Sequence, residues 1–456
     1  MILHDHELAV ATGGTLVSPG SAGAISTDSR RLHSGTWFLA LSGERFDGHA
    51  FLEMARDSGC AGAIARHVPD DWDRGFVQVD DGLQALQDIA RHVRRDFPGP
   101  VVGITGSAGK TTTRALTALA LGDLGPIHAT HGNLNNHIGV PLTILQAPVG
   151  AAAWVLEMGM SGFGEIDLLQ EIGAPQVRVV TNVGAAHLEG VGSLDGVARA
   201  KGELFDGARA GDVCVVNADD PRVAALPIPA GVRVLRYGSS QDCDVRLTDA
   251  VVDPVALCTR FRIETGDRVV RGTIPAPGAY LAENAAAAVA VAVALRAPLD
   301  GLAARFAAYE PVGMRLRVEE GPAGSRVLND AYNANPLSVN ATLRTLAAMP
   351  GRRVALLGDM LELGSHESGL HEEVLANALR LGLDAIGTVG PRFAAAAAQL
   401  DARGRVDALD TPEALADRVR PGLTADTTVL IKGSRGLAME RILRRWSPAP
   451  SPGEDA

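Results

Sequence analysis

The sequence predicts an α/β protein of three domains, with a mostly parallel sheet at its centre. Short apolar runs typical of buried strands alternate with helical stretches along most of the 456 residues. At about 100–200 residues per domain, a chain of this length should hold about three domains. A Pro/Gly cluster at Pro98–Pro100 and the Glu310-Pro311 pair are typical of domain boundaries. We therefore expect domains at residues 1–97, 98–310 and 311–456.

The elements expected in the first domain are three buried strands and a closing helix. The strands are indicated by the apolar runs Trp37–Leu41, Ala61–Ala65 and Phe76–Val79. Leu83–Phe97 has helical periodicity and ends at the Pro/Gly cluster.

The second domain should be a parallel sheet with helices on both faces, because strand, glycine loop and helix follow one another from Val101. A more polar strand-like section occupies roughly Asp242–Thr273, and an Ala-rich helix is expected from Tyr280 toward Arg305. Further strands of this domain are expected at Trp154–Leu156, Val177–Thr181 and Val213–Val216, and those of the third domain at Arg326–Asp330, Val354–Gly358, Ala385–Val389 and Thr428–Lys432.

Composition narrows the class of protein. The hydrophobic share of 46% and charged share of 21% are those of ordinary globular domains. The net charge of -11 argues against a binder of long nucleic acid, which usually has a basic face. The four cysteines have no metal-binding spacing, and no apolar run approaches the length of a membrane span. We expect a cytoplasmic monomer with no signal peptide, membrane span or nucleic-acid partner.

The loop Gly106-Ser107-Ala108-Gly109-Lys110-Thr111 lies between a strand and a helix, which is the setting of a phosphate-binding loop. Backbone N–H groups and the helix N-terminus would surround phosphates, Lys110 would reach the β/γ-phosphates, and the Thr111 hydroxyl would bind Mg²⁺. Ile104 stands where the longer motif has its first glycine, so the shorter G-x-x-G-K-T form applies. Such a loop predicts nucleotide binding but not the reaction.

Polar residues follow two other expected strands. Glu157 ends one strand, His187 comes just after the next, and Lys201 lies on an expected helix. Because ligands of open α/β sheets bind beyond the carboxyl ends of the strands, Thr111, Glu157 and His187 should share one crevice. Taken alone, His187 is compatible with an ordinary surface histidine, and Lys201 with a solvated charge.

Several motifs together resemble one family, the Mur ligases. They are G-S-A-G-K-T-T, His131–Thr143, Leu156–Ile166, Thr181–Ser193 and Ala200–Leu204. Four further segments are similar to the members that add the last dipeptide to the UDP-muramoyl peptide of peptidoglycan: Ser26–Arg30 with Leu41–Phe51, Asp330–Pro336, Leu356–Gly364 and Lys432–Arg435. Singly, each could be a turn or a helix cap. In this order they cover the chain from about Ile25 to Arg441.

The resemblance implies an ATP-dependent ligase that joins D-alanyl-D-alanine to UDP-N-acetylmuramoyl-tripeptide through an acyl phosphate. It implies catalytic roles for Lys110, Lys201 and His187, and two Mg²⁺ ions, one held by Thr111 and Glu157, the other by His187 and a carbamylated Lys201. The implied ATP contacts are Gly106, Ser107, Ala108, Gly109, Lys110, Thr111, Thr112, Asn284, Arg315, Asp330 and Tyr332. The implied substrate contacts are Ser26, Thr27, Asp28, Ser29, Arg30, Gly43, Glu44, Arg45, Phe46, Asn133, Asn135, Asn136, Asn333, Asn335, Lys432 and Arg435.

The chain departs from the family pattern near the adenine side. Tyr280 and Leu281 follow Pro277-Gly278-Ala279 where the family often has a histidine and an asparagine, and Asn329 and Ala331 replace an acid and a small hydroxyl residue. Two other functions remain open at this point. One is a sibling ligase, such as a folylpolyglutamate synthetase or an earlier step of the pathway. The other is a nucleotide-dependent regulatory switch, for which Glu157, His187 and Lys201 would have no clear use.

Overall fold

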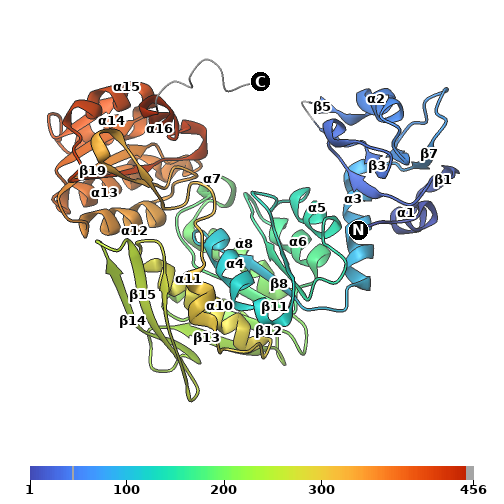
Figure 1. The fold of residues 1–456 in the computed structure, drawn as a ribbon, viewed down its shortest axis with the longest axis horizontal. Helices are drawn as coiled ribbons and strands as arrows, with labels where there is room; N and C mark the ends of the chain where they lie inside the picture. The colour runs from blue at the N-terminus through green and yellow to red at the C-terminus, as the bar shows by residue number, and fades with distance from the viewer. Residues whose placement is uncertain (44–45, 448–456) are drawn as a thin grey trace.

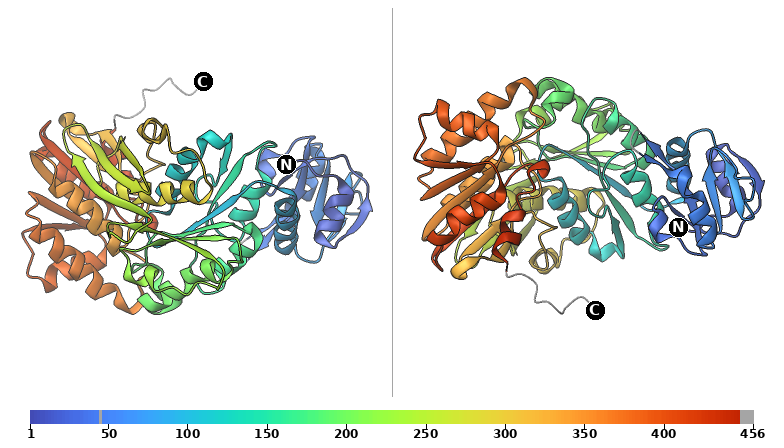
Figure 2. Two further views of the ribbon diagram at one scale, coloured as in Figure 1. Left: turned by 90° about the horizontal axis from the view of Figure 1, so that it is seen from below. Right: turned by 90° about the horizontal axis from the view of Figure 1, so that it is seen from above.

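The computed structural model describes residues 1–43 and 46–447. Three separate sheets, of five, nine and six strands, follow one another along the chain. Figure 1 shows the first and third at opposite ends of an elongated molecule, with the second between them, and Figure 2 shows the same order from two further sides. The predicted α/β class with a central parallel sheet and two smaller flanking units is confirmed.

The first sheet has the order β1-β7-β6-β3-β2, and only β1 pairs antiparallel. Trp37 and Phe38 on β3 are both buried, and they anchor the two apolar layers of this unit. Helix α3 packs against the central unit, where the Arg94 guanidinium donates to the carbonyls of Gly173 and Ala174. The elements of the first unit are α1 (Asp5–Thr12), β1 (Thr15–Ser18), β2 (Ala24–Ser26), β3 (Thr36–Leu39), α2 (Leu52–Asp57), β6 (Gly62–Ala65), β7 (Gly75–Gln78) and α3 (Gly82–Asp96). They include a small two-stranded ribbon of β4 (Ser42–Gly43) and β5 (Phe46–Asp47).

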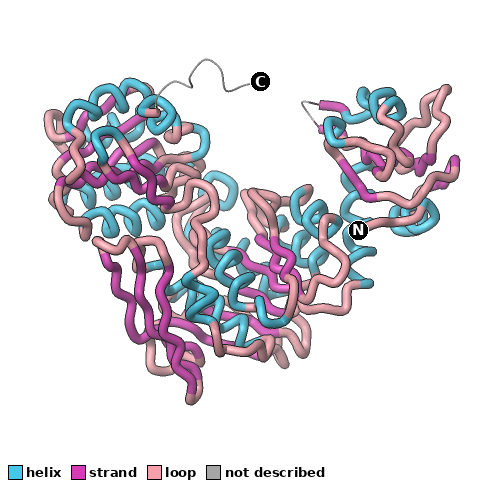
Figure 3. The backbone as a smooth tube through the Cα atoms, viewed as in Figure 1, coloured by secondary structure: helices cyan, strands magenta, loops and turns pink. Residues whose placement is uncertain are grey.

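The central sheet has the order β16-β15-β14-β13-β12-β11-β8-β10-β9 and is parallel from β14 to β9. Its strands are β8 (Val101–Thr105), β9 (Ile127–Ala129), β10 (Ala153–Glu157), β11 (Val177–Val180), β12 (Val213–Asn217), β13 (Arg233–Gly238), β14 (Val245–Asp253), β15 (Cys258–Thr265) and β16 (Arg268–Ile274). The helices are α4 (Lys110–Ala120), α5 (Gly139–Leu145), α6 (Glu165–Gly173), α7 (Leu188–Val191), α8 (Leu194–Asp206), α9 (Pro221–Ala224), α10 (Tyr280–Ala294) and α11 (Leu302–Ala307). Figure 3 shows β14–β16 as long antiparallel strands at the outer edge, where the sequence indicates a polar strand-like section.

The third sheet has the order β17-β18-β22-β19-β20-β21, with only β17 antiparallel. Its strands are β17 (Arg317–Glu320), β18 (Arg326–Asn329), β19 (Arg352–Gly358), β20 (Ala385–Val389), β21 (Val406–Leu409) and β22 (Thr427–Lys432). Its helices are α12 (Pro336–Ala347), α13 (Glu367–Arg380), α14 (Pro391–Gln399), α15 (Pro412–Val419) and α16 (Arg441–Trp446). Asn335 caps α12 by accepting from the Ser338 N–H at 2.9 Å, just before a proline at the first helical position.

One expected element is wrong. The Ala-rich helix does not continue toward Arg305, because α10 ends at Ala294 and α11 is a separate helix. Arg296 adopts a left-handed φ of 54°, and Pro298 follows, which has no N–H to offer a continuing helix. Along the described part of the chain, no helix combines the length and apolar character needed to cross a membrane.

Candidate active site

A cavity of about 700 Å³ lies between the central and third units, and it is lined by residues of both. It opens beyond the carboxyl ends of β8, β10 and β11, where the loop after β8, Glu157 and His187 meet. The expected convergence of Thr111, Glu157 and His187 on one crevice therefore agrees with the geometry.

The loop after β8 wraps tightly, and its glycines are required by their surroundings. Gly109 has φ 80° and directly precedes α4, and a Cβ there would lie 2.7 Å from Asn284 Oδ1. Gly106 has φ 149°, and a Cβ there would overlap the Thr181 side chain. The N–H groups at the start of α4 are thus left facing the cavity, which is the arrangement that binds phosphate.

Asn182, two residues after the end of β11, holds this loop, a role that the sequence analysis missed. Its Oδ1 accepts from the Ala108 N–H at 2.8 Å, and its Nδ2 donates to the Ala108 carbonyl at 3.1 Å. Ser107 is fixed in the same way, since its hydroxyl donates to the Gly184 carbonyl at 3.0 Å. The signal was present in the Thr181–Ser193 motif, but the pairing joins segments far apart in the chain.

Lys110 lies at the cavity, with its Nζ donating to the Gly106 carbonyl at 2.7 Å. Desolvation lowers the pKa of its ammonium, while the Glu157 carboxylate acts in the opposite direction. The side chain therefore rests against its own loop, within the region where phosphates would lie.

Glu157 is 2% exposed and accepts hydrogen bonds on both carboxylate oxygens. Thr111 Oγ1 donates to Oε2 at 2.8 Å, and Asn135 Nδ2 donates to Oε1 at 2.8 Å. The Arg114 guanidinium lies 3.7 Å from Oε2. A hydroxyl and a carboxylate oxygen in contact are the hard donors that Mg²⁺ prefers.

Lys201 lies on α8 and is 1% exposed, so the reading of it as a solvated charge is wrong. Burial lowers the pKa of its amine well below the ordinary value, and Lys110 lowers it further. No carboxylate within the described ranges offsets these effects on Lys201. A buried neutral amine is the form that can react with CO₂, so the environment fits carbamylation.

His187 directly precedes α7 as its N-cap, with a left-handed φ of 57°, and it lines the cavity. Its Nδ1 lies 2.6 Å from Oε2 of Glu362, a residue of the third unit. The contact with the His187 imidazole lowers the pKa of the Glu362 carboxyl. No group of three or more His, Cys, Asp and Glu side chains with metal-binding geometry occurs in residues 1–43 and 46–447.

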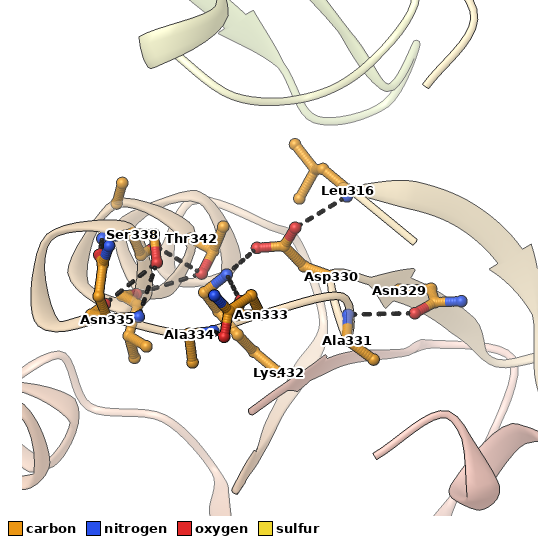
Figure 4. A network of polar contacts seen from close by, with 12 residues as sticks. Leu316, Asn329, Asp330, Ala331, Asn333, Ala334, Asn335, Ser338, Thr342 and Lys432 are labelled. Atoms are coloured by element: carbon orange, nitrogen blue, oxygen red, sulfur yellow. Dashed lines mark hydrogen bonds and ion pairs between the residues drawn. The ribbon is translucent and has the colours of Figure 1, made fainter. Parts of the chain in front are cut away.

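The third unit supplies a polar network to the cavity, drawn in Figure 4. Lys432 Nζ lies 2.5 Å from Asp330 Oδ2 and donates to the Asn333 carbonyl at 3.0 Å. Burial raises the pKa of the Asp330 carboxyl, and the Lys432 ammonium opposes that shift. Asn335 Nδ2 reaches across to donate to the Ser107 carbonyl at 3.1 Å, so the third unit contacts the phosphate loop directly.

On the expected adenosine side, the Arg315 guanidinium stacks 3.7 Å from the centre of the Tyr332 ring. The Tyr280 and Leu281 departures line the same cavity, near Asn284. Asn329 turns away to donate to Glu319 Oε1 at 2.8 Å. Asn329 at the end of β18 and Ala331 just after it are therefore structural here, whereas Tyr280 contributes to the cavity wall.

The expected substrate residues divide between this cavity and other places. The cavity is lined by Asn135, Asn136, Asn333, Asn335 and Lys432. Asn133 does not line it, and Arg435 pairs instead with Glu440. Glu44 and Arg45 lie outside the described residues. The residues that belong to the first unit, away from the cavity, are Ser26, Thr27, Asp28, Ser29, Arg30, Gly43 and Phe46.

Comparisons with known proteins agree with this architecture. Residues 104–292 match the Mur ligase middle domain, and residues 314–435 match the Mur ligase, glutamate ligase domain. The chain is 34% identical over 448 residues to the UDP-N-acetylmuramoyl-tripeptide--D-alanyl-D-alanine ligase of Bacillus subtilis (strain 168), with 96% of each protein covered.

Two solved structures are similar along nearly their whole length. A crystal structure of MurF from Acinetobacter baumannii has a TM-score of 0.90 at 30% identity and covers 97% of this chain and 98% of that one. MurF ligase from Thermotoga maritima in complex with ADP has a TM-score of 0.83 at 29% identity, with 93% and 97% covered. The chain belongs to the Mur ligase family, among the UDP-N-acetylmuramoyl-tripeptide--D-alanyl-D-alanine ligases.

Proposed function

We propose that the chain joins D-alanyl-D-alanine to UDP-N-acetylmuramoyl-tripeptide, with conversion of ATP to ADP and phosphate, during peptidoglycan synthesis. The observation that carries this proposal is the shared cavity, in which a phosphate loop and the Thr111–Glu157 pair face Asp330 and Lys432 of the third unit. A regulatory switch would have no use for that opposed set of groups. A sibling ligase is not favoured, because full-length relatives carry the dipeptide-adding name.

The chemistry follows from the poor electrophilicity of a carboxylate, which must be activated before an amine can attack it. A carboxylate oxygen of the tripeptide attacks the γ-phosphorus of ATP, the bond to the β-phosphate oxygen breaks, and an acyl phosphate forms. The amine of the dipeptide then attacks the acyl carbon and loses a proton, and phosphate leaves from the tetrahedral intermediate. The chain mainly positions the reactants and balances charge.

The ATP phosphates are assigned to Gly106–Thr112, with Lys110 leaving the Gly106 carbonyl to neutralise the transferring group. Asn284, Arg315, Asp330 and Tyr332 would hold the adenosine side. In support, Asn284 lies against Gly109 at the start of α4, and Arg315, Asp330 and Tyr332 line the cavity beside it.

Two Mg²⁺ ions are part of the proposal. Thr111 and Glu157 would hold one, and His187 with carbamylated Lys201 would hold the other. When bound, the ions would stabilise negative charge on the phosphates and the attacking oxygen. Lys201 would supply the second site only after its neutral amine attacks CO₂ and loses a proton, which converts the amine to a carbamate with two carboxylate-like oxygens.

The UDP-sugar end is assigned to the first unit, through Ser26–Arg30 and the segment from Gly43 to Phe46. Asn133, Asn135 and Asn136 would contact the peptide part of the nucleotide substrate. Asn333, Asn335, Lys432 and Arg435 would receive the dipeptide, although Arg435 must then exchange Glu440 for that ligand. The domain divisions 1–97, 98–310 and 311–456, a monomeric state and a cytoplasmic location complete the proposal.

One assay tests it. Purified chain is incubated with ATP, Mg²⁺, the UDP-muramoyl-tripeptide and either D-Ala-D-Ala or single amino acids, and product and phosphate are measured together. We expect phosphate release only with both the tripeptide and the dipeptide. Faster joining of a single amino acid to a shorter precursor would reassign the step.

A further inference from the structure

A second cavity lies on the central unit, outside the candidate active site. It has a volume of about 530 Å³, opens to solvent, and lies between α4, β9 and the residues that follow α11. Helices α4 and α11 pack against each other, as Figure 1 shows. Among the described residues, those that line this cavity include none that line the active-site cavity. The two cavities are therefore separate spaces.

The lining of the second cavity combines apolar walls with a few polar groups. Its most deeply buried lining residues are Tyr309, which is 3% exposed, and Arg114, which is 6% exposed. Glu310 also lines the cavity but is exposed. A cavity of this size, with an apolar wall and few polar groups, is typical of sites for small organic ligands. The apolar lining residues are Ala115, Ala118, Leu119, Ile127, Ala129 and Ala308.

Arg114 carries a positive charge that the protein balances incompletely. Its Nε is buried and has no hydrogen-bond partner within residues 1–43 and 46–447. Nε faces Glu157, whose Oε2 lies 3.7 Å away, beyond hydrogen-bond distance. Burial lowers the pKa of this guanidinium, and the Glu157 carboxylate opposes that shift. Because a guanidinium stays charged in proteins, unused donors on a buried one favour the binding of an anion.

We propose that this cavity binds a small organic carboxylate with an apolar body, whose carboxylate pairs with the terminal amino groups of Arg114. A guanidinium presents N–H donors in a fork that matches a carboxylate, and such pairs are stronger than neutral hydrogen bonds. The apolar walls favour an organic acid over inorganic phosphate, because only the organic acid removes their surface from water.

The site is independent of the proposed ligase reaction, so each can fail without the other. The competing interpretation is that Arg114 serves only as a counter-charge to Glu157 and that the cavity holds no ligand.

The test uses para-fluorobenzoate, a carboxylate with an aromatic body, as the probe. Its binding to the full chain is followed by the line width of its fluorine nuclear magnetic resonance signal. Titrations are run with and without Mg²⁺ and a non-hydrolysable ATP analogue, which competes only for the active-site cavity. The matched neutral ligand is para-fluorobenzamide, which has the same ring and no charge.

We expect the unmodified chain to bind the probe in about the millimolar range, which is usual for so small a ligand. The neutral amide and Arg114→Gln should each weaken binding by about tenfold or more, because a charge-assisted pair is lost. Ala118→Leu should weaken it as much, because it fills the cavity and leaves the guanidinium in place. Glu310→Gln is the matched control; it removes the other charge of the lining and should bind the probe at least as tightly.

Circular dichroism and Tm verify the fold of each variant, and Ala118→Leu alone decides if Arg114→Gln does not fold. Failure of the unmodified chain to bind the probe would overturn the site, as would unchanged binding by a folded Ala118→Leu. Equal binding of the neutral amide would refute the role of Arg114. Displacement of the probe by the ATP analogue would place it in the active-site cavity, and displacement by inorganic phosphate would refute the choice of an organic acid.

Discussion

Lys110 lies where the transferred phosphoryl group should be, and its ammonium is held there by the Gly106 carbonyl. We predict that Lys110→Ala lowers kcat by at least about a hundredfold, the scale seen when a main electrostatic stabiliser is deleted. Steady-state phosphate release measures this, with circular dichroism to verify folding. A near-normal rate in a folded variant would mean that this loop does not carry the reaction.

Lys201 provides a prediction about covalent chemistry. Lys201→Ala should nearly abolish turnover while nucleotide binding at the loop persists, because the backbone N–H groups and Lys110 of the loop remain in place. A short carboxylic acid should restore part of the rate by occupying the vacated ligand position, and removal of CO₂ should slow the unmodified enzyme. Mass spectrometry of the intact chain and rescue assays are the measurements. An active Lys201→Arg variant would contradict the carbamate, because a guanidinium cannot form one.

Residues with a role set by their own chemistry could be predicted from the sequence, and those with a role set by distant neighbours could not. Thr111 lies in the first turn of α4 and Glu157 ends β10, both at the edge of the sheet where the α/β fold gathers ligands, and they are in contact. Asn182 and Glu362 were inside recognised motifs, but their partners, Ala108 and His187, come from other segments. The burial of Lys201 also depends on the packing of α8, which no local pattern indicates.

At the scale of elements, α13 fixes the start of the loop that reaches the central unit. His371 on α13 is fully buried; its Nε2 accepts from the Met360 N–H at 2.9 Å, and its Nδ1 lies 2.6 Å from the Glu367 carbonyl. Burial lowers the pKa of this imidazole, against the raising influence of the Asp359 carboxylate. The neutral ring is thus the form that joins helix and loop.

The pH dependence of stability follows from that lowered pKa. Because the unfolded chain binds a proton more readily at this position, the stabilisation is complete above about pH 6.5 and is lost as the pH falls toward the folded value. His371→Gln, which keeps an acceptor but cannot titrate, should show a smaller fall in Tm between pH 7 and pH 5. Differential scanning calorimetry would check this, and parallel Tm curves would refute it.

Element boundaries were predictable where burial was strong. β8, β10 and β12 are buried throughout and lie within a residue or two of their apolar runs. The short, partly exposed β1 and β17 gave no such run and pair antiparallel at sheet edges. The end of α10 depended on Arg296 and Pro298, a local stop inside an otherwise continuous alanine pattern.

On the scale of the whole molecule, the cavity needs groups from both the central and third units, and few polar bridges join them. We predict that the third unit moves about a hinge near Pro311 and that ATP with the UDP-substrate favours the docked state. Small-angle X-ray scattering should show a smaller radius of gyration with both ligands than with either alone. An unchanged radius would contradict the hinge.

The left-handed backbone at His187 and Glu362 has a consequence for engineering the enzyme. Glycine adopts that conformation without the penalty of about 1–2 kcal/mol that other residues meet there. A search for heat-resistant variants that screens only for folded protein should therefore accept glycine at both positions, whereas a screen for product would reject it at the proposed metal ligand His187. Thermal robustness and turnover would be selected in opposite directions at His187, so a useful library should hold that residue constant and seek stability elsewhere.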